Sequence, residues 1–549
     1  MSTKMKRAIN FILVFLVGCS NSGSLQTTTP VSITNTSAPT HEPSIEVAQT
    51  PSATSTPQPY HPTTNYGPDD FPSNINPLTG REVLEPSLLQ LPAVLVSISN
   101  SPASARPQAG PGFAPWVFEL FIGEGATRFM NVFYGGIPRN VPNITGECEV
   151  REEILYPSGD WIGDRVWLDE NENGTQDDWE MGIGGVCVRL LDGNSRMVID
   201  EARTDSNGYY AFKNPKRDVI IQFIKPSAYQ FTQTNIGYED KDSDADQMTG
   251  ETGIVQTDTT ASFWDVGLIL SEGILPTPRP DATSTPFYIP AETYVGPIRS
   301  GRLTYNQIGA MFPNSCLVYA SAAWDIGERL DACEIVFGVD KTTPNSALLK
   351  VSRLRELAQE NLNSKQPVNY SGNLFSHDVP EDGQSANQIN VFYHAYNRSA
   401  WTYDPISQTY LRFTDDADGK GILHLATDRL TERQLAFENV IVIFAEHMRF
   451  RHNQFEVNFE NGQSEPAYLF RDGKAFKIYW RTINREYEKT SGLRRPMHFV
   501  DAQGNLIPLH PGRTWIHIVT PFSSVTDKGN AEWLVKFVQP YDPPDTPEP

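Results

Sequence analysis

One acidic stretch decides the fold of the central part of this 549-residue chain: Asp169-Glu170-Asn171-Glu172-Asn173-Gly174-Thr175-Gln176-Asp177-Asp178-Trp179-Glu180. It matches the calcium-loop pattern Asp-x-Asp/Asn-x-Asp/Asn-Gly-x5-Glu at every specified position. Ca²⁺ takes about six to eight oxygen ligands, which such a loop supplies from side chains, a backbone carbonyl and a final bidentate carboxylate. The predicted ligands are Asp169, Asn171, Asn173, Thr175 through its carbonyl, Asp177 and Glu180.

The flank of this loop predicts a strand and not a helix. Residues 161–168 read Trp-Ile-Gly-Asp-Arg-Val-Trp-Leu, and short strands separated by Asn, Asp and Gly turns continue through the region 147–270. This pattern is typical of an all-β sandwich, so a helix-loop-helix calcium pair is not expected. The alternative is a polar turn that matches the loop pattern by accident.

Three ordered motifs in this region carry a family resemblance. They are Ile162 to Asp169, Gly182 to Val186, and Thr204 to Phe212. With them the region resembles the B-repeat domain of serine-aspartate repeat surface adhesins. The resemblance implies a spacer sandwich that several calcium ions make rigid.

A second group of carboxylates follows at Asp240, Asp242, Asp244 and Asp246. Like charges this close repel one another unless a cation bridges or screens them. The related domains also use an acidic loop here, so we expect a second Ca²⁺. The alternative is a solvated loop, and neither group implies catalysis.

The regions on both sides of the sandwich carry a second set of motifs. They are Asn76 to Gly80, Arg106 to Gln108, Gly125 to Phe129, Gly296 to Arg302, and Pro508 to Ile516. These regions resemble the YerB-like family of bacterial lipoproteins, whose domain has no known function. We therefore expect a host domain with its first half at 75–140, its second half at 293–365 and a C-terminal part at 366–540.

This order predicts that the sandwich is inserted in a loop of the host between Tyr134 and Val295. A surface loop accepts a folded insert when the ends of the insert lie close together. The host mixes predicted strands with an amphipathic helix that carries Leu354, Leu357 and Ala358 on one face. The fold class expected is a multidomain chain with an α+β or α/β host, an all-β calcium-binding sandwich and a β-rich α+β C-terminal part.

Four arginines of the host motifs suggest an anion site, because guanidinium groups recognise carboxylates and phosphates through fixed pairs of donors. They are Arg106, Arg128, Arg299 and Arg302, and the acids expected near them are Glu119 and Glu124. The alternative is that these acids pair with the arginines and hold the two host halves together. Under either hypothesis the residues before and after the sandwich lie close to one another.

An enzyme acting on envelope polymers is the second functional hypothesis, and it would use the same arginines and Glu119. Ser300 is not in a nucleophile-elbow motif, and no histidine stands near it in the sequence. The chain has no glycine loop of the kind that cradles phosphates. We therefore expect a protein without catalytic activity.

The N-terminus predicts export and lipid attachment. The positive residues Lys4, Lys6 and Arg7 precede a short apolar run that ends at Leu16-Val17-Gly18-Cys19, which resembles the lipobox of bacterial lipoproteins. In that family the cysteine carries the lipid, so 1–19 is the expected signal peptide and Cys19 the attachment residue. Stretches rich in Pro, Thr and Ser predict a disordered tether at 20–74, a linker at 271–292 and a tail at 541–549.

The remaining four cysteines fit an oxidising compartment. The least entangled pairing joins Cys148 to Cys187 and Cys316 to Cys333, and the alternative is four buried thiols. The net charge of -22 argues against nucleic acid as a partner, since its phosphates would be repelled. The sequence thus predicts an envelope or surface lipoprotein that holds Ca²⁺ and binds a cell-wall polymer or an envelope protein.

Overall fold

The computed structural model describes residues 64–139, 148, 161–257, 263–271, 293–338, 345–363, 367–451, 454–459, 465–482 and 486–540. The predicted signal peptide, Cys19, the linker after residue 271 and the tail lie outside these residues, as does the tether up to residue 63. No helix among the described residues has both the length and the apolar character needed to span a bilayer.

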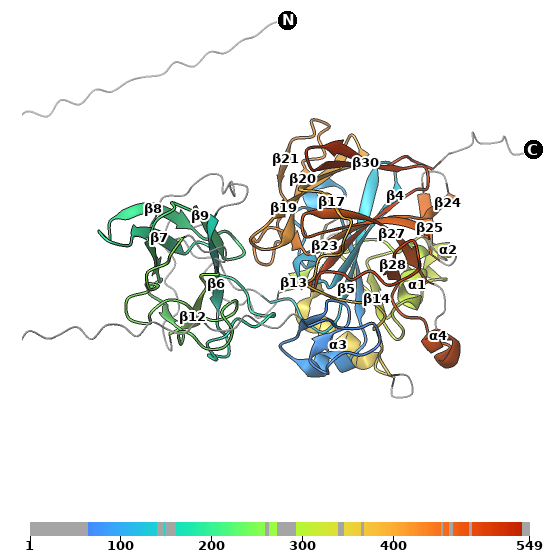
Figure 1. Cartoon of the computed structure of the whole chain (residues 1–549). Helices are drawn as coiled ribbons and strands as arrows, with labels where there is room; N and C mark the ends of the chain where they lie inside the picture. The colour runs from blue at the N-terminus through green and yellow to red at the C-terminus, as the bar shows by residue number, and fades with distance from the viewer. Residues whose placement is uncertain are drawn as a thin grey trace, which may run out of the picture. The chain divides into compact units, whose positions relative to one another are not determined.

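One eleven-stranded sheet runs through the whole host domain, and it contains both parallel and antiparallel pairs. Among the members of this sheet that Figure 1 labels, β4 and β5 are blue and β23, β27 and β28 are orange to red. In spatial order it contains β15 (Glu334–Ile335), β14 (Cys316–Tyr319), β3 (Val94–Ser99), β5 (Ala126–Phe133), β4 (Trp116–Gly123), β29 (Thr514–Val519), β23 (Asn439–Phe444), β26 (Glu465–Arg471), β27 (Lys474–Arg481) and β17 (Gln384–Ser385), with β28 (His498–Val500) also paired to β27.

The pairing of β4 with β29 unites the two ends of the host. Trp116 lies beside Thr514 and Glu119 beside His517 in a parallel register. β4 precedes the insert, and β29 lies near the C-terminus. The host parts before and after 365/366 therefore share one sheet, because residues of 366–540 complete the sheet begun by residues 75–140.

Both faces of this sheet are buried, because its strands alternate apolar residues toward two cores. Val117 and Phe121 of β4 join one core, and Phe118 and Leu120 join the other. The first core is closed by a seven-stranded sheet that includes Trp401 and Trp533. That sheet contains β21 (Leu423–Leu425), β20 (Thr409–Asp415), β19 (Asn397–Asp404), β18 (Gln388–His394), β31 (Glu532–Lys536) and β30 (Ser524–Gly529), with β22 (Ala436–Phe437) paired to β20.

The helices of the host are short, so the α+β or α/β class expected for it is not confirmed. The longest, α3 (Val351–Glu360), buries Leu354, Leu357 and Ala358 in the first core, as its spacing predicts. The others are α1 (Thr304–Ala310), α2 (Trp324–Gly327) and α4 (Glu486–Ser491). Strands dominate the described chain, and it is mostly β.

The inserted module, coloured green in Figure 1, is a β-sandwich with its own core. One sheet contains β10 (Val219–Ile224), β7 (Cys187–Asp192) and β8 (Val198–Arg203). The other contains β11 (Tyr229–Phe231), β12 (Val266–Leu270), β6 (Trp161–Leu168) and β9 (Tyr209–Lys213). The prediction of an all-β sandwich at this place is confirmed.

The first and last strands of the module, β6 and β12, are adjacent in one sheet. β6 and β12 are parallel neighbours in which Val166 lies beside Val266. The start of β6 and the end of β12 therefore point to opposite ends of the sheet, about nine residues or ~30 Å apart at the usual rise per residue. In the host, by contrast, the break points are adjacent, since Phe133 and Val295 both flank Gly110.

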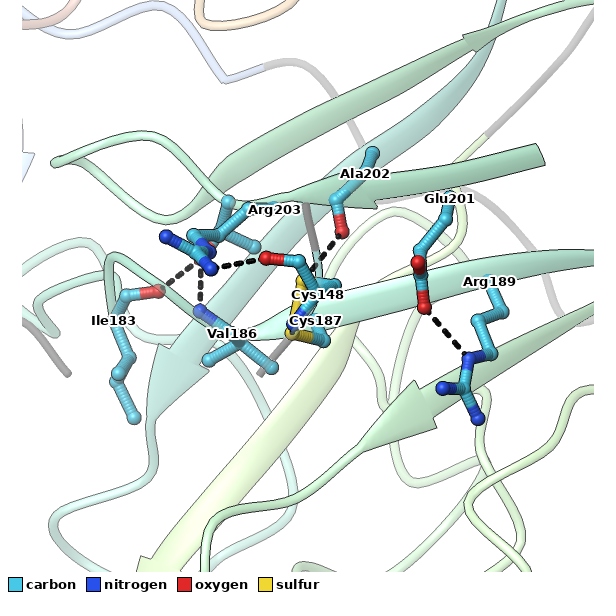
Figure 2. Close-up of a disulfide and its surroundings, with 9 residues drawn as sticks. Cys148, Ile183, Val186, Cys187, Arg189, Glu201, Ala202 and Arg203 are labelled. Carbon is cyan, nitrogen blue, oxygen red and sulfur yellow. Dashed lines mark hydrogen bonds and ion pairs between the residues drawn. A yellow bond between two sulfur atoms is a disulfide. The ribbon is translucent and has the colours of Figure 1, made fainter. Parts of the chain in front are cut away.

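Two disulfides join the cysteines as the least entangled pairing predicts. Cys148 is bonded to Cys187 in the module, and Cys316 is bonded to Cys333 in the host. Figure 2 shows the first bond, with the guanidinium of Arg203 donating to the carbonyl oxygen of Cys148. This bond attaches the segment at Cys148 to the start of β7.

Candidate functional site

The loop from Asp169 to Glu180 turns its oxygens inward. The carboxylate of Asp169, which is 1% exposed, accepts the backbone N–H groups of Asn173 at 3.2 Å and Gly174 at 2.9 Å. The carboxylate of Glu180, 3% exposed, accepts the N–H groups of Glu170 at 2.9 Å and Asp177 at 3.0 Å. The first and last predicted ligands are thus buried and held by the loop's own backbone.

The middle ligands converge on one carboxylate. The Nδ2 atoms of Asn171 and Asn173 donate to Oδ2 of Asp177 at 2.8 and 3.1 Å. The amide oxygens are also in use, because Asn171 Oδ1 accepts the N–H of Asn173 at 3.1 Å and Asn173 Oδ1 accepts the N–H of Thr175 at 2.7 Å. Asp169, Asn171, Asn173 and Asp177 thus gather side-chain oxygens within one loop, and oxygen is the donor atom that Ca²⁺ prefers.

Three carboxylates of the loop, Asp169, Asp177 and Glu180, repel one another. Burial raises the pKa of Glu180 to about 7, and repulsion from Asp169 and Asp177 also raises it, although two backbone hydrogen bonds oppose the shift. A bound cation would remove this repulsion. Among the described residues no group of three or more His, Cys, Asp or Glu side chains is placed to hold a metal ion. A cation in the loop would therefore also need the two amides and the carbonyl among the predicted ligands.

The acidic segment 240–246 packs against this loop. The N–H of Gln176 donates to the carbonyl of Lys241 at 2.6 Å, and the ammonium of Lys241 lies 2.8 Å from the carboxylate of Asp178. The hydroxyl of Thr232 donates to Asp169 at 2.5 Å. The two predicted calcium-binding segments are therefore neighbours in one end of the sandwich.

Three carboxylates gather in a second cluster, and two of them come from the predicted set. Asp265, just before β12, donates its N–H to Asp244 at 2.6 Å, and Asp244 donates its N–H to the carbonyl of Asp265 at 2.8 Å. Burial, and then repulsion from Asp242, raises the pKa of Asp244 well above its usual value. Asp242 is fully buried, and neither of its carboxylate oxygens has a hydrogen-bond partner within the described chain.

Asp246 has a different role from the one predicted. It is exposed, and its Oδ1 accepts the N–H groups of Met248 and Thr249 and the hydroxyl of Thr249 at 2.9 to 3.1 Å. It closes a local turn and does not contribute to the buried cluster. Asp240 is half-buried and raises the pKa of Asp242, so it lies at the margin of the cluster.

In the host, Glu119 belongs to a buried network and not to an open anion site. Its carboxylate accepts the hydroxyl of Thr127 at 2.8 Å, the indole N–H of Trp515 at 3.2 Å and the guanidinium of Arg412 at 3.3 Å. The ring of His517 lies 3.3 Å away. Arg412 comes from β20 of the facing sheet and stacks on Trp515, 4.5 Å from its ring centroid. This ion pair joins the two sheets of the host across the first core.

The expectation of one site for all the host residues is wrong, and strand alternation gives the reason. Glu119 lies beside Phe129 in the β4–β5 pair, so Arg128 points to the opposite face of the sheet. Arg106 donates to the backbone of Asn100 and pairs with Asp415 at 3.2 Å, next to Arg412. Glu124 is exposed in the turn between β4 and β5. The combined arginine and glutamate site of the enzyme hypothesis therefore does not assemble.

The other three predicted residues do come together. Arg128 donates to the carbonyl of Ser300 at 3.1 Å and to its hydroxyl at 3.2 Å, and Arg302 donates to the same hydroxyl at 3.0 Å. Burial lowers the pKa of Arg128 to about 10, and repulsion from Arg302 and Arg299 adds to this shift, although Tyr305 opposes it. The proximity expected across the insert thus holds for Arg128, Arg299 and Arg302.

A groove of about 610 Å³ lies elsewhere in the host, at the ends of β23, β26 and β27. Its walls include Phe444, Pro466, Tyr468 and Tyr479, with Glu465 and Lys477 at polar positions. It contains none of the predicted residues. Aromatic walls with a few polar groups are typical of surfaces that bind ligands or peptides.

Sequence reasoning missed several residues of these clusters. Asp265 and Thr232 join the predicted calcium-binding end through folding, and no local pattern marks them. Arg412 and His517 complete the network of Glu119 from distant strands. His517 directly follows the closing motif of the host, Pro508 to Ile516, which was the one signal near it.

Comparison with known families agrees with this division of the chain. Residues 160–268 match the SdrD B-like domain. Residues 78–150 match the N-terminal domain of a protein of unknown function, DUF3048, and residues 389–516 match its C-terminal domain. The chain therefore carries both DUF3048 domains with an SdrD B-like domain inserted between them.

Individual relatives cover only parts of the chain. Serine-aspartate repeat-containing protein D of Staphylococcus aureus (strain Newman) is 35% identical over 157 residues, which is 26% of this chain and 12% of that protein. Serine-aspartate repeat-containing protein F of Staphylococcus epidermidis (strain ATCC 12228 / FDA PCI 1200) is 35% identical over 132 residues, 24% of this chain and 8% of that protein. The chain thus spans a small part of these relatives. The crystal structure of YerB protein from Bacillus subtilis aligns with 81% of this chain and 96% of its own, at 16% identity and a TM-score of 0.43.

Proposed function

We propose that this protein is a non-catalytic envelope lipoprotein, attached through Cys19 and displayed outside the cytoplasm, which binds a cell-wall polymer or an envelope protein. In this proposal the inserted module is stabilised by Ca²⁺ and acts as an adhesive arm. The observation that carries it is the inward-facing oxygen set of Asp169 to Glu180 beside the buried, unpaired carboxylate of Asp242.

Calcium would stabilise the module by joining segments that are distant in the sequence. Asp169 is already bonded to Thr232, and Gln176 to Lys241, so an ion held by the loop also fixes the segment 232–244. A cation beside the second cluster would reduce the repulsion among Asp242, Asp244 and Asp265, although these three side chains are not placed as a ligand set by themselves. Because an unfolded chain offers neither site, binding free energy adds directly to the stability of the fold.

The topology favours an appended arm over a spacer between the host halves. The host sheet is continuous from β3 to β29, and the chain leaves and re-enters it beside Gly110. A rigid module attached at two adjacent points does not change the distance between the halves. The stiffness of the module would instead hold in place a binding surface on the module itself.

The groove in the host domain supports the proposal that this domain binds a wall polymer or a protein. Phe444, Tyr468 and Tyr479 offer aromatic faces, and Glu465 and Lys477 offer charge. A wall polymer or a protein segment would place apolar surface on the rings and polar groups at the rim. This groove is separate from the calcium-binding end in sequence and in chemistry.

Co-sedimentation of the full chain with isolated cell walls tests the proposal. The wild-type chain should sediment with walls in millimolar calcium, and chelator should reduce the bound fraction if the module contributes adhesion. Glu180→Gln, which removes the bidentate carboxylate, should reproduce the effect of chelator, and Glu124→Gln serves as the matched control. Failure of the wild-type chain to retain walls or any envelope protein would contradict the proposal.

A further inference from the structure

The host groove at the ends of β23, β26 and β27 is built on neighbouring strands of one sheet. Pro466 of β26 lies directly opposite Tyr479 of β27, and two residues further along Tyr468 lies opposite Lys477. Residues directly opposite in an antiparallel pair have their side chains on the same face. β23 is the neighbour of β26 on its other side, and it ends at Phe444. The register of the strands thus gathers two tyrosines, a proline and a lysine on one face, with a phenylalanine beside them.

The first core of the host holds the aromatic rings of this groove in place. Phe444 and Tyr468 are half-buried and pack against that core. Their ring centroids lie 6.4 Å apart, and the ring of Tyr468 lies 5.9 Å from that of Trp533 on the covering sheet. Trp480 is buried, and its indole N–H donates to the carbonyl of Phe444 at 2.9 Å. A ligand would therefore meet rings that are already ordered, which lowers the entropic cost of binding.

Polar side chains line the groove beside these rings. They belong to Glu446, Glu465, Asn458 and Lys477. Glu446 and Asn458 lie opposite each other in a hairpin, where Nδ2 of Asn458 donates to Oε2 of Glu446 at 3.3 Å. Both glutamates and Lys477 are exposed. The groove thus offers two carboxylates and one ammonium around an apolar floor.

The backbone under the groove is not available to an added strand. β26 is hydrogen-bonded to β23 on one side and to β27 on the other. β23 is also paired with β29, and β27 is also paired with β28. A peptide that binds by strand addition needs an open sheet edge. Recognition in this groove must therefore come from side chains.

The acidic groups also disfavour two other kinds of ligand. Proline-rich segments bind aromatic grooves, but proline has no N–H, so such a segment would cover Glu446 and Glu465 without supplying donors. A carboxylate that loses water without gaining hydrogen bonds costs free energy. A polymer of phosphates would be repelled, because the two carboxylates outnumber the one ammonium of Lys477.

A sugar with an acetamido group matches every part of this lining. The C–H face of a sugar ring packs on aromatic rings, and the hydroxyl groups at its edge donate to carboxylates. The acetamido group adds a methyl for the rings, an N–H for a carboxylate and a carbonyl for the ammonium of Lys477. The groove volume of about 610 Å³ lies within the roughly 300 to 1,000 Å³ that is usual for sites of small ligands, so it has room for a short oligosaccharide.

We propose that this groove binds a polysaccharide of N-acetylated amino sugars. The rings of Phe444, Tyr468 and Tyr479 pack on the sugar faces, and Glu446 and Glu465 accept hydroxyl and amide protons. This inference rests on the proposed function, in which the host domain binds a wall polymer or a protein, and it names the class of polymer. It involves no catalytic step.

Calorimetric titration of the full chain with the β-1,4-linked tetramer of N-acetylglucosamine, in the presence of chelator, tests the groove. The wild-type chain should bind saturably. Tyr479→Ala should raise the Kd about tenfold or more, because truncating an anchoring ring removes much of the binding free energy. Tyr479→Phe keeps the ring, and its Kd should stay within about threefold of the wild-type value. Tyr396→Ala is the matched control, since Tyr396 is 56% exposed and does not line the groove, and its Kd should equal that of the wild type.

Melting curves show whether each variant is folded, and Glu465→Gln at an exposed position replaces Tyr479→Ala if the latter unfolds. Glu465→Gln weakens a hydrogen-bond acceptor and should raise the Kd about threefold or more. A wild-type chain that does not bind the tetramer overturns the proposal, as does equal affinity in the wild type, Tyr479→Ala and Glu465→Gln. Decaproline that binds in place of the tetramer, and binds more weakly to Tyr479→Ala, overturns the ligand class in favour of a protein segment.

Co-sedimentation with cell walls separates this proposal from the proposed function. Wall retention by a wild-type chain that does not bind the tetramer overturns the sugar site and leaves the proposed function standing. Tetramer binding without retention of walls or of any envelope protein contradicts the proposed function and leaves the sugar site standing.

Discussion

The buried ion pair of Glu119 and Arg412 gives a prediction with a defined magnitude. Glu119 is fully buried and Arg412 is 1% exposed, so neither charge is screened by solvent. Glu119→Gln keeps the shape of the side chain but leaves the guanidinium without a counter-charge, which costs about 3 to 5 kcal/mol in buried pairs. At about 2 °C per kcal/mol for a large domain, the melting temperature of the host should fall by roughly 6 to 10 °C.

Calorimetric and urea unfolding of the full chain measure this loss, with Glu124→Gln as the control. Glu124 is exposed, and its substitution should change stability by no more than about 0.5 kcal/mol. The double variant Glu119→Gln with Arg412→Met should recover part of the loss, because it removes both charges of this pair and leaves neither one unpaired. A Glu119→Gln chain as stable as the Glu124→Gln control would refute the reasoning.

Four further predictions follow from other parts of the chain. Glu180→Gln should weaken calcium binding by about tenfold or more in calorimetric titration, because it removes the bidentate ligand, and an unchanged affinity would argue against the loop. Burial lowers the pKa of His517 to about 4, so the unfolded chain takes up the proton at a higher pH than the folded chain does. The free energy of unfolding should therefore fall as the pH drops from about 6.5 to 4, by at most about 3 kcal/mol. His517→Gln should make the urea midpoint depend less on pH in this range. Replacing Cys148 and Cys187 by serine opens a loop with a sequence separation of 39 and should cost the module about 4 kcal/mol, measured by its melting with and without reductant. Cys19→Ala should release the protein from membrane fractions or block its processing, and unchanged fractionation would show that Cys19 is not the anchor.

Local patterns in the sequence predicted the parts of the fold that depend on nearby residues. The loop of Asp169 to Glu180 follows from its spacing, and the sandwich follows from short strands between turns. Leu354 and Leu357 face the core as their helical spacing requires. These features depend on contacts within a few residues, which one sequence displays directly.

Features that depend on strand order could not be predicted. Glu119 and Arg128 were expected in one site because both lie in host motifs, yet alternation along paired strands sends them to opposite faces. The parallel pairing of β6 and β12, which puts the start of the first strand and the end of the last at opposite ends of their sheet, is a further example. Asp265 joined the acidic cluster for the same reason, since only the folded sheet places it beside Asp244.

The central claim is that the inserted module is a calcium-stabilised fold, and scanning calorimetry of the full chain tests it most directly. The unfolding transition of the module should move upward between chelator and millimolar calcium, corresponding to about 2.7 kcal/mol when calcium exceeds its Kd a hundredfold. The same comparison on Glu180→Gln should show a much smaller change, and the host transition should stay in place. A wild-type module that melts at the same temperature in chelator and in calcium would contradict the account.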